Sequence, residues 1–418
     1  MDKKWFQRKK GKLVERLEMA MAAVILGLLC VLVIMVIAIK VRGTAEDQAQ
    51  RVQSQEVKAQ TDSQQSDQET STQEKAESQE ELYLGPRDGN GYEPMTEVEK
   101  AALEEKRQVS ASFTVSAAGD CTLGTDERFA KNTSFVAKYE EVQDPSYFFA
   151  GVQSIFGADD LTIVNLEGTF TELTSRADKQ YAFKGDPSYV DILTSGSVEA
   201  VNVANNHSKD YGTQSYYDTL DVLRGAGVKY FGYGTTVLTE INGIQVGLLG
   251  TYELGQGIEC QEDMLAGLKS LKDQGAQVII ASFHWGVERE NYPTDVQVEL
   301  AHLAIDNGAD LVLGHHPHVL QGIEKYKGKY IAYSLGNFCF GGNKNPSDKD
   351  TMIFQQTFTL KDGELQVDDN IQVIPCTLSS TDARNDYQPT LAEGERADEI
   401  LERIREYSSE LGTENPVA

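Results

Sequence analysis

Cysteine is scarce in this sequence, with five residues among 418. Four of them lie beyond the first hundred residues at wide spacings: Cys121, Cys260, Cys339 and Cys376. Small secreted folds held together by disulfides are much richer in cysteine, which excludes that class. We therefore expect the four side chains to be small, buried hydrophobic groups. The alternative, metal ligation by Cys121 next to Asp120, lacks a second cysteine at ligand spacing.

Positive charge is also in short supply. The chain has 38 lysines and arginines against 65 aspartates and glutamates, for a net charge of −27. Proteins that bind nucleic acid or an anionic membrane surface through bulk electrostatics carry a basic patch, so we expect neither mode of binding and no nucleic-acid partner. No repeat with a period of about 20 to 50 residues is visible, and we expect no repeat architecture.

Charged residues are missing from one stretch near the start of the chain, residues 19–39. A helix of that length rises about 1.5 Å per residue and spans about 31 Å, the thickness of the hydrocarbon core of a bilayer. Seven basic residues precede the stretch, and only Lys40 and Arg42 follow it before the next acidic residue. The positive-inside rule then predicts a single-pass type II protein of the cell membrane, with a cytoplasmic basic tail, residues 1–18, and an extracytoplasmic domain.

A cleaved signal peptide and a lipid anchor are the alternatives for this segment. The apolar stretch is too long for a typical signal peptide, and Val41–Ala45 contains no clear small-x-small cleavage site. A lipoprotein signal has a small residue before its cysteine, whereas here Leu29 precedes Cys30. We therefore expect an uncleaved transmembrane anchor at residues 19–39.

A polar linker, residues 40–110, is predicted after the anchor. Its Ala45–Glu80 part is rich in Gln, Ser, Glu, Asp and Lys and has no aromatic residue. Such a segment cannot bury enough apolar area to offset the entropy lost on ordering, so we expect a disordered tether. A short helix is predicted at Thr96–Arg107, with Pro94 near its start.

Short apolar runs alternate with helical patterns from Ser112 onward, which is typical of an α/β domain. Strands are predicted at Phe113–Ala118, Leu161–Asn165, Ala200–Ala204, Val228–Phe231, Gln245–Leu249, Val278–Phe283 and Leu311–Leu313. Helices are predicted at Pro145–Phe156, Pro187–Thr194, Gln214–Ala226, Gln261–Gln274 and Asp295–Asn307. We expect one domain over residues 111–378.

Antiparallel strands are predicted in the later part of this domain, so the sheets should be mixed. They are Val319–Tyr326, Lys329–Leu335, Thr351–Leu360 and Glu364–Val373, with hairpin turns at Lys327-Gly328 and Lys361–Gly363. Residues 379–418 predict a polar segment and an amphipathic helix, Leu391–Leu411, whose apolar face should pack against the domain.

Histidine is concentrated in three short loops that follow apolar runs. Five of the six histidines lie in Asn205–His207, His284–Gly286 and Gly314–His318, and the carboxylates Asp120 and Glu167 end two earlier runs. Because ligands bind outside the carboxyl ends of the strands in open α/β sheets, these five segments should meet at one edge. Two carboxylates, an asparagine and several histidines suit one or two divalent transition metals such as Mn, Fe or Zn.

The predicted metal ligands share this placement at strand ends: Asp120, Glu167, Asn206, His284, His316 and His318. Two ions about 3.5–4 Å apart would support metal-assisted hydrolysis, with Glu167 as the bridge and His207 as the general acid. Candidates to line the site are Asn165, Asn205, Trp285, His315 and Asn337. Trp285 is expected to pack beside the site, and Asn337 with Phe338 is equally consistent with a turn. His302 is interpreted as structural, and Lys184 as either a substrate contact or solvated surface.

Six motifs in this order resemble the CapA family of poly-γ-glutamate capsule biosynthesis proteins. They are Ala118–Asp120, Asn165–Gly168, Ala204–His207, His284–Gly286, Gly314–His318 and Ser334–Phe338, and the resemblance covers Phe113 to Ile374. It implies a fold similar to the calcineurin-like metallophosphoesterases, an αββα sandwich of mixed sheets. It also implies an anionic envelope polymer, such as poly-γ-glutamate, as substrate or partner.

The resemblance also implies roles for individual residues. Carried over from the phosphoesterases, Asp120 corresponds to the first-metal carboxylate and Glu167 to the bridging one. Asn206 and His284 correspond to second-metal ligands, and His207 to the acid that binds no metal.

Three features depart from the phosphoesterase pattern. The bridging residue is Glu167 rather than Asp, and Thr122 stands where the first motif has His. His316 and His318 match a Gly-His-x-His pair by spacing, although His315 directly follows the glycine. The first metal site is therefore weak, mononuclear or completed by His315.

The preferred function is a membrane-anchored, extracytoplasmic metal-dependent hydrolase or transferase that acts on an anionic envelope polymer. The alternative is a non-catalytic accessory subunit of a membrane complex that synthesises or exports the polymer, with a structural metal site. A catalytic metal site keeps an open coordination position, whereas a structural site does not, and this difference distinguishes the two functions. The net charge of −27 repels a polyanion, so bound cations or the local field of the site must offset it.

Overall fold

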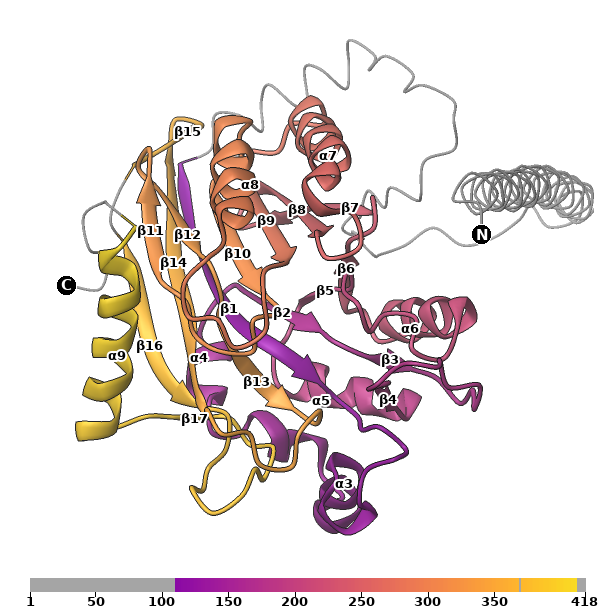
Figure 1. Cartoon of the computed structure of the whole chain (residues 1–418). Coiled ribbons are helices and arrows are strands. Elements are labelled where there is room, and N and C mark those ends of the chain that lie inside the picture. Colours follow the sequence, from indigo (N-terminus) through magenta and orange to yellow (C-terminus); the bar gives the residue numbers. More distant parts are fainter. Residues whose placement is uncertain (1–109, 368–369, 412–418) are drawn as a thin grey trace, which may run out of the picture. The chain divides into compact units, whose positions relative to one another are not determined.

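Two mixed sheets packed face to face form the centre of the domain (Figure 1). The computed structural model describes residues 110–367 and 370–411. The predicted basic tail, anchor, linker and Thr96–Arg107 helix lie outside these residues. Within the described ranges, no helix is long and apolar enough to cross a membrane.

The first sheet has the strand order β17-β16-β14-β1-β2-β5-β6, with β13 paired to β1 and β15 to β14. Its strand β1 runs parallel to β2 and β13 and antiparallel to β14. The strands are β1 Ala111–Thr122, β2 Leu161–Leu166, β5 Ala200–Asn202, β6 Lys229–Phe231, β13 Asn337–Phe340, β14 Asp350–Lys361, β15 Glu364–Leu365, β16 Ile371–Thr377 and β17 Thr390–Leu391.

The second sheet has the strand order β11-β12-β10-β9-β8-β7. Strands β8, β9, β10 and β12 run parallel, whereas β7 and β11 pair antiparallel at the two edges. The strands are β7 Thr236–Ile241, β8 Ile244–Tyr252, β9 Val278–His284, β10 Leu311–His315, β11 Ile323–Tyr326 and β12 Lys329–Ala332. A separate parallel pair consists of β3 Thr169–Phe170 and β4 Lys184–Gly185.

Helices cover the outer faces of the two sheets, so the domain is an α/β sandwich (Figure 1). Helices α7 and α8 share a hydrophobic cluster with the second sheet, and α5 and α6 share one with the first. The helices are α3 Phe135–Val142, α4 Gln153–Phe156, α5 Val190–Ser195, α6 Thr213–Gly225, α7 Gln261–Asp273, α8 Asp295–Asp306 and α9 Gly394–Ser409. Short 3₁₀ turns are η1 Lys131–Thr133, η2 Pro145–Phe149, η3 Pro187–Tyr189 and η4 Gly257–Cys260.

The core between the sheets is built from alternate residues of the facing strands. Phe113 and Val115 of β1 share one buried cluster with Leu248, Ile280 and Leu313 of the second sheet. Successive side chains of a strand point to opposite faces, so one face of each strand supplies this core. Burial of that apolar surface is the main favourable term in folding, and it holds the two sheets together.

A bulge in β1 adjusts the position of Asp120 near the end of the strand. The register with β2 shifts between Ala117 and Asp120, and the Asp120 amide donates to the carbonyl oxygen of Gly336 at 2.9 Å. A Cβ at Gly119 would collide with that same carbonyl group. The close approach therefore requires glycine, and such bulges often re-aim a side chain beside an active site.

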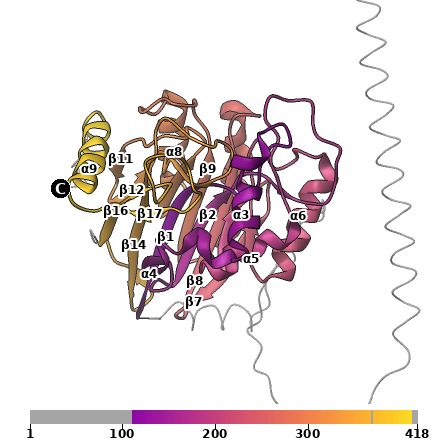
Figure 2. The ribbon, with the colours of Figure 1, turned by 90° about the horizontal axis from the view of Figure 1, so that it is seen from below.

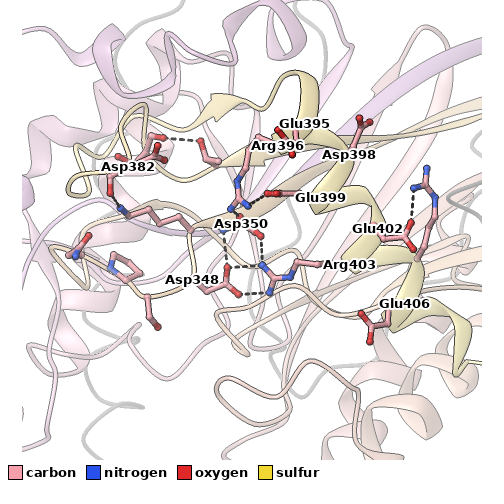
Figure 3. A pocket seen from close by; sticks show the side chains of 17 residues that line it. Asp348, Asp350, Asp382, Glu395, Arg396, Asp398, Glu399, Glu402, Arg403 and Glu406 are labelled. Carbon is pink, nitrogen blue, oxygen red and sulfur yellow. Dashed lines mark hydrogen bonds and ion pairs between the residues drawn. The ribbon is translucent and has the colours of Figure 1, made fainter.

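Helix α9 lies along the edge of the sandwich, against β16 and β11 (Figure 2). Ile400 and Ile404 are buried in the core between the sheets, which confirms the predicted packing of the C-terminal helix. Arg403 pairs with Asp348 at 2.7 Å and with Asp350, and Arg396 also pairs with Asp350 (Figure 3). An open cavity of about 1170 Å³ lies beside these pairs.

Three predicted elements differ from the structure. The helix predicted at Pro145–Phe156 is wrong as one element, because η2 and α4 are separated at Gly151, where a Cβ would collide with the Pro389 carbonyl oxygen. The single strand Glu364–Val373 is also wrong, since β15 and β16 are separate. The strand predicted from Val319 begins at Ile323.

Five strands were not predicted: β3, β4, β7, β13 and β17. Strand β7 forms a hairpin with β8 through Asn242-Gly243, whose φ angles are 51° and 85°. That dipeptide is the strongest short-range hairpin signal, so the sequence contained the information. Asn337 and Phe338 begin β13 rather than forming a turn, because the chain turns one residue earlier at Gly336, where φ is 76°.

The cysteines of the described domain are free and buried. Cys121, Cys339 and Cys376 pack in the hydrophobic cluster under α5 and α6, and Cys260 packs under α7. The expectation that they are small buried hydrophobic groups is confirmed.

Candidate metal centre

The predicted site residues lie at the carboxyl ends of strands from both sheets. Asp120 lies near the end of β1, Glu167 directly follows β2, and His284 and His315 end the parallel neighbours β9 and β10. Figure 1 shows β1 and β10 running side by side from the two sheets. The sandwich therefore brings together residues that are far apart in sequence.

Glu167 is buried and surrounded by imidazoles. Its Oε1 lies 3.6 Å from His207 Nε2, 3.7 Å from His318 Nε2 and 4.0 Å from His284 Nε2. Among the described residues, neither carboxylate oxygen has a hydrogen-bond partner. Burial raises the pKa of Glu167, and Asp120 raises it further against the lowering effect of His318. A buried carboxylate without donors is costly, and a cation satisfies it.

The bare geometry already contains a possible ligand set. One ligand atom from each of Glu167, His316 and His318 lies within 4.8 Å of the others. His316 and His318 have positive φ angles of 96° and 59°, which non-glycine residues adopt at a cost of about 1–3 kcal/mol. Backbone strain of this kind gathers at functional sites, because the surrounding structure must hold it.

Asp120 forms the other carboxylate of the centre. Its Oδ1 accepts from Asn165 Nδ2 at 2.8 Å, and its Oδ2 accepts from the His316 amide at 3.2 Å. His318 Nδ1 lies 3.2 Å from Oδ2. Burial alone would raise the pKa of Asp120, but the hydrogen bond and charge of His318 hold it below its usual value. His318 thus stands between two carboxylates, which raise its own pKa against the effect of burial.

Three further predicted ligands or their neighbours meet around His284. His284 Nε2 is 2.9 Å from Asn206 Oδ1, and the His284 and His316 rings are 4.8 Å apart. The His316 Nδ1 atom is buried with no partner in the described structure. Burial lowers the pKa of His284, and His316 lowers it further. Burial and His318 lower the pKa of His316 to about 4. Both imidazoles are therefore neutral near pH 7, which is the form that binds metals.

His315 points into the same centre from the end of β10. Its ring is buried, its Nδ1 lies 3.7 Å from Asp120 Oδ1, and neither ring nitrogen has a partner within the described ranges. The Thr122 hydroxyl is also buried without a partner. Burial lowers the pKa of His315 to about 4, so the ring is neutral. An imidazole therefore lies beside Asp120, although position 122 is a threonine.

Three asparagines next to the centre are joined by side-chain hydrogen bonds. Asn165 Oδ1 accepts from Asn202 Nδ2 at 3.2 Å and from Asn205 Nδ2 at 3.3 Å, and Asn205 Oδ1 accepts from the His207 amide at 3.0 Å. Asn165 and Asn205 position other groups by these bonds. Asn202 was not predicted, although a polar residue inside a buried apolar strand was a signal.

His207 is oriented by a neighbour in sequence. Its Nδ1 lies 2.6 Å from Asp210 Oδ2, and Asp210 also accepts from Lys179 Nζ at 2.7 Å. Its Nε2 faces Glu167, and the Phe183 ring lies 4.4 Å from the imidazole. Burial lowers the pKa of His207, against the raising effect of Asp210. Asp210 and Lys179 were missed, although Asp210 follows His207 by three residues.

The contacts of three other residues show whether each belongs to the centre. Trp285 does not line the centre: it is buried against Phe283 and Tyr333 and donates to the Tyr333 carbonyl oxygen. His302 stacks on Tyr326 at 3.7 Å and is structural, as predicted. Lys184 donates to the Leu173 carbonyl oxygen, so it is neither a site residue nor simply solvated.

The centre opens into a cleft of about 450 Å³. His207, His318 and Asn337 form part of its lining. Asn337 Oδ1 lies 2.9 Å from His318 Nδ1, and its amide donates to the His318 carbonyl oxygen. A substrate in this cleft would therefore reach the proposed acid and one side of the ligand set.

Fold and site together define an α/β sandwich protein with a buried centre of histidines and carboxylates at strand ends. The chain belongs to the family described as "Bacterial capsule synthesis protein PGA_cap", which matches residues 114–342. All predicted site residues fall within that range. The resemblance to CapA proteins is thereby confirmed.

Curated relatives carry related names. The PGA biosynthesis protein CapA of Bacillus subtilis (strain 168) is 31% identical over 253 residues, 56% of this chain and 63% of the relative. The capsule biosynthesis protein CapA of Bacillus anthracis is 33% identical over 187 residues, 40% and 46% of the two chains. A probable polyglutamine synthesis accessory protein of Mycobacterium tuberculosis (strain ATCC 25618 / H37Rv) is 29% identical over 211 residues, 43% and 55%. The matches thus span less than two thirds of each relative's length.

Proposed function

We propose that this chain is a metal-dependent hydrolase or transferase that acts in the synthesis, export or processing of an anionic cell-envelope polymer such as poly-γ-glutamate. The observation that supports it best is Glu167, a buried carboxylate with no hydrogen-bond partner among the described residues and three imidazoles around it. The names of the Bacillus relatives suggest the polymer.

The proposed ligands fall into two sets that share Glu167, in the manner of the metallophosphoesterases. Asp120, His318 and His315 belong to one set, and Asn206, His284 and His316 to the other. This mixture of imidazole, carboxylate and amide suits Mn, Fe or Zn, in one or two copies. When bound, such an ion supplies Lewis-acid polarisation of the bond to be cleaved and stabilises charge on the displaced oxygen.

His207 is the proposed general acid. Asp210 accepts the Nδ1 proton, so the Nε2 atom faces the centre and the cleft. With Nδ1 donating to Asp210, Nε2 carries a proton only when the ring is protonated on both nitrogens, a form that Asp210 favours against the effect of burial. From that form the Nε2 proton would pass to the leaving group of the polymer bond. Such proton transfer contributes roughly 10²–10⁴-fold to rate in other enzymes.

The decisive experiment measures metal content and turnover of the full chain after loading with Mn, Fe or Zn. Glu167→Gln should lose most bound metal and all turnover of γ-glutamyl and phosphodiester substrates, because it removes the shared carboxylate. Glu199→Gln is the matched control, since Glu199 is a carboxyl group outside the centre that accepts from the Thr162 amide. A wild-type chain that binds no metal, or a Glu167→Gln chain that binds it fully, overturns the proposal.

The second candidate function is an accessory subunit of a membrane complex, with the metal in a structural role. It is favoured by the name of the mycobacterial relative. This function is supported if the wild-type chain binds metal but shows no turnover, and if the His207→Asn variant still supports polymer formation.

We also propose that the domain is extracytoplasmic and tethered to the cell membrane by residues 19–39. The support is the charge-free stretch of bilayer length and the basic residues that precede it. Residues 40–110 then act as the linker, and residues 111–378 as the PGA_cap-type domain.

A further inference from the structure

Three cationic side chains line the cleft in front of the candidate metal centre: Arg128, Arg289 and Lys344. Each residue is exposed. None of the three side chains forms an ion pair with a residue that the structure describes, whereas the cations Arg176, Lys179 and Arg403 all do. In a chain with a net charge of −27, unpaired cations gathered in one cleft are unexpected for a merely solvated surface.

Buried polar residues fix the backbone that carries two of these cations. The Arg128 amide donates to Asp126 Oδ1 at 2.9 Å, and Asp126 is buried and paired with Arg176 at 2.5 Å. The Lys344 carbonyl oxygen accepts from the amide of Asn385, whose side chain is also buried. The charged side chains of Arg128 and Lys344 therefore extend from backbone that hydrogen bonds hold in place. A fixed backbone lowers the conformational entropy that is lost when these side chains bind an anion.

Arg289 is held directly against the proposed ligand loop. Its φ angle of 66° lies in the left-handed region, and its amide donates to the Pro317 carbonyl oxygen at 2.8 Å. Pro317 lies between His316 and His318. A strained non-glycine residue tied to a ligand loop is the kind of feature that persists for function.

An aromatic wall completes the cleft. Phe129, Tyr181 and Phe183 lie in its lining, with Phe129 at 6.0 Å from Tyr181 and Tyr181 stacked on Phe183 at 6.3 Å. The Tyr181 side chain is 45% exposed, which leaves its ring free to contact a ligand. Cations beside an apolar wall fit a chain in which anionic groups alternate with methylene segments.

We propose that Arg128, Arg289 and Lys344 are specificity-determining residues that bind the anionic groups of a substrate chain, while the aromatic wall contacts its apolar segments. The proposal rests on the proposed function for the place where the bond is cleaved, but binding itself requires no turnover. Carboxylate and phosphate oxygens share the required chemistry, and the two probes below distinguish them.

The test titrates the full chain, loaded with metal, with a γ-linked glutamate oligomer and with polyglycerol phosphate. A triple variant, Arg128→Gln, Arg289→Gln and Lys344→Gln, should bind at least one probe about tenfold or more weakly and with a flatter dependence on salt. Its metal content should equal that of the wild type. Lys269→Gln is the matched control, because Lys269 is an exposed lysine on α7 away from the cleft. The affinity of this variant for each probe should differ less than twofold from that of the wild type.

Each outcome decides the proposal. Weaker binding of the glutamate oligomer identifies carboxylates as the groups bound, and weaker binding of polyglycerol phosphate identifies phosphates. Equal affinity of the triple variant and the wild type for both probes overturns the proposal, as does a wild-type chain that binds neither. If the wild type binds as expected but never turns over, the enzymatic function fails while the assignment of these three residues stands.

Discussion

Several residues of the centre have buried polar atoms with no hydrogen-bond partner among the described residues. Glu167, His315 and Thr122 all bury polar atoms that accept or donate no hydrogen bond to the described residues. Buried polar groups are normally satisfied, and each exception calls for a cause. Other buried atoms of the described residues also lack a partner, such as those of Gln274 and Gln356, but these three residues lie together at the strand ends, where a cation or substrate is the simplest cause.

The His207→Asn change should separate chemistry from metal binding. Because Nε2 faces the centre while Asp210 holds Nδ1, the variant should keep its metal and lose about 10²–10⁴-fold in turnover. Metal analysis, circular dichroism and rate measurements on the same samples check this. Loss of metal together with activity would make His207 a ligand instead.

His315→Ala tests whether this ring replaces the imidazole missing at position 122. The variant should bind less metal, by up to one ion per chain, because it removes a neutral nitrogen beside Asp120. His302→Ala is the control, since that ring stacks on Tyr326 outside the centre. Unchanged stoichiometry in the His315 variant would assign its ring to packing.

At the scale of elements, helix α9 is joined to the wall of the cleft. Asp348 borders both the cleft and the cavity beside α9, and it pairs with Arg403 of that helix (Figure 3). The segment before β14 is thus held by the C-terminal helix. The apolar contacts of Ile400 and Ile404 with the core position the helix for this pairing.

Arg403→Leu should lower the free energy of unfolding by about 2–3 kcal/mol, because it leaves Asp350, 1% exposed, short of one partner. Part of the effect is screened by solvent, since the Arg403 side chain is 30% exposed. Urea unfolding measures the change. Lys269→Leu, which removes an exposed pair on α7, should cost about 1 kcal/mol or less, and equal losses in both variants would contradict the role of the α9 pairing.

Glu199 gives the fold a pH dependence. Burial raises its pKa to about 7 from an ordinary value of 4.5, so between these values the folded state binds more protons than the unfolded state. The free energy of unfolding should therefore fall as pH rises from about 4.5 to 7. Because solvent screens this partly exposed group, Glu199→Gln should remove only on the order of 1–2 kcal/mol of that fall, as measured by urea unfolding at pH 5 and pH 8. Parallel curves for the two proteins would disprove it.

At the scale of the whole molecule, the arrangement proposed is a domain tethered outside the membrane. Protease added to intact spheroplasts should remove the domain and leave a short stub that contains residues 19–39, because the basic residues before the stretch stay in the cytoplasm. Immunoblots against both ends of the chain check this. A soluble mature form that begins after Ile39, or a protected C-terminal domain, is the contrary result.

Much of the fold and site was predictable from local patterns. Apolar runs placed β2 and β9 to within one residue of the observed ends, and the site residues Glu167 and His284 stand at those ends. The α/β class and mixed sheets followed from the same runs. Helix η2–α4 was mispredicted because its break depends on Gly151 meeting the distant Pro389.

The sequence alone determined which kinds of side chain stand at the strand ends, because strand pattern and residue chemistry are local properties of the chain. Tertiary structure decided how they meet. The positions of His316 and His318 depend on backbone with positive φ angles. The approach of His315 to Asp120 depends on contacts between distant segments, and the orientation of His207 depends on its hydrogen bond to Asp210. The position of Arg289 in the cleft likewise depends on a tertiary contact, the hydrogen bond from its amide to the Pro317 carbonyl oxygen. No periodicity in the sequence encodes such contacts, since they form only when the two sheets pack together.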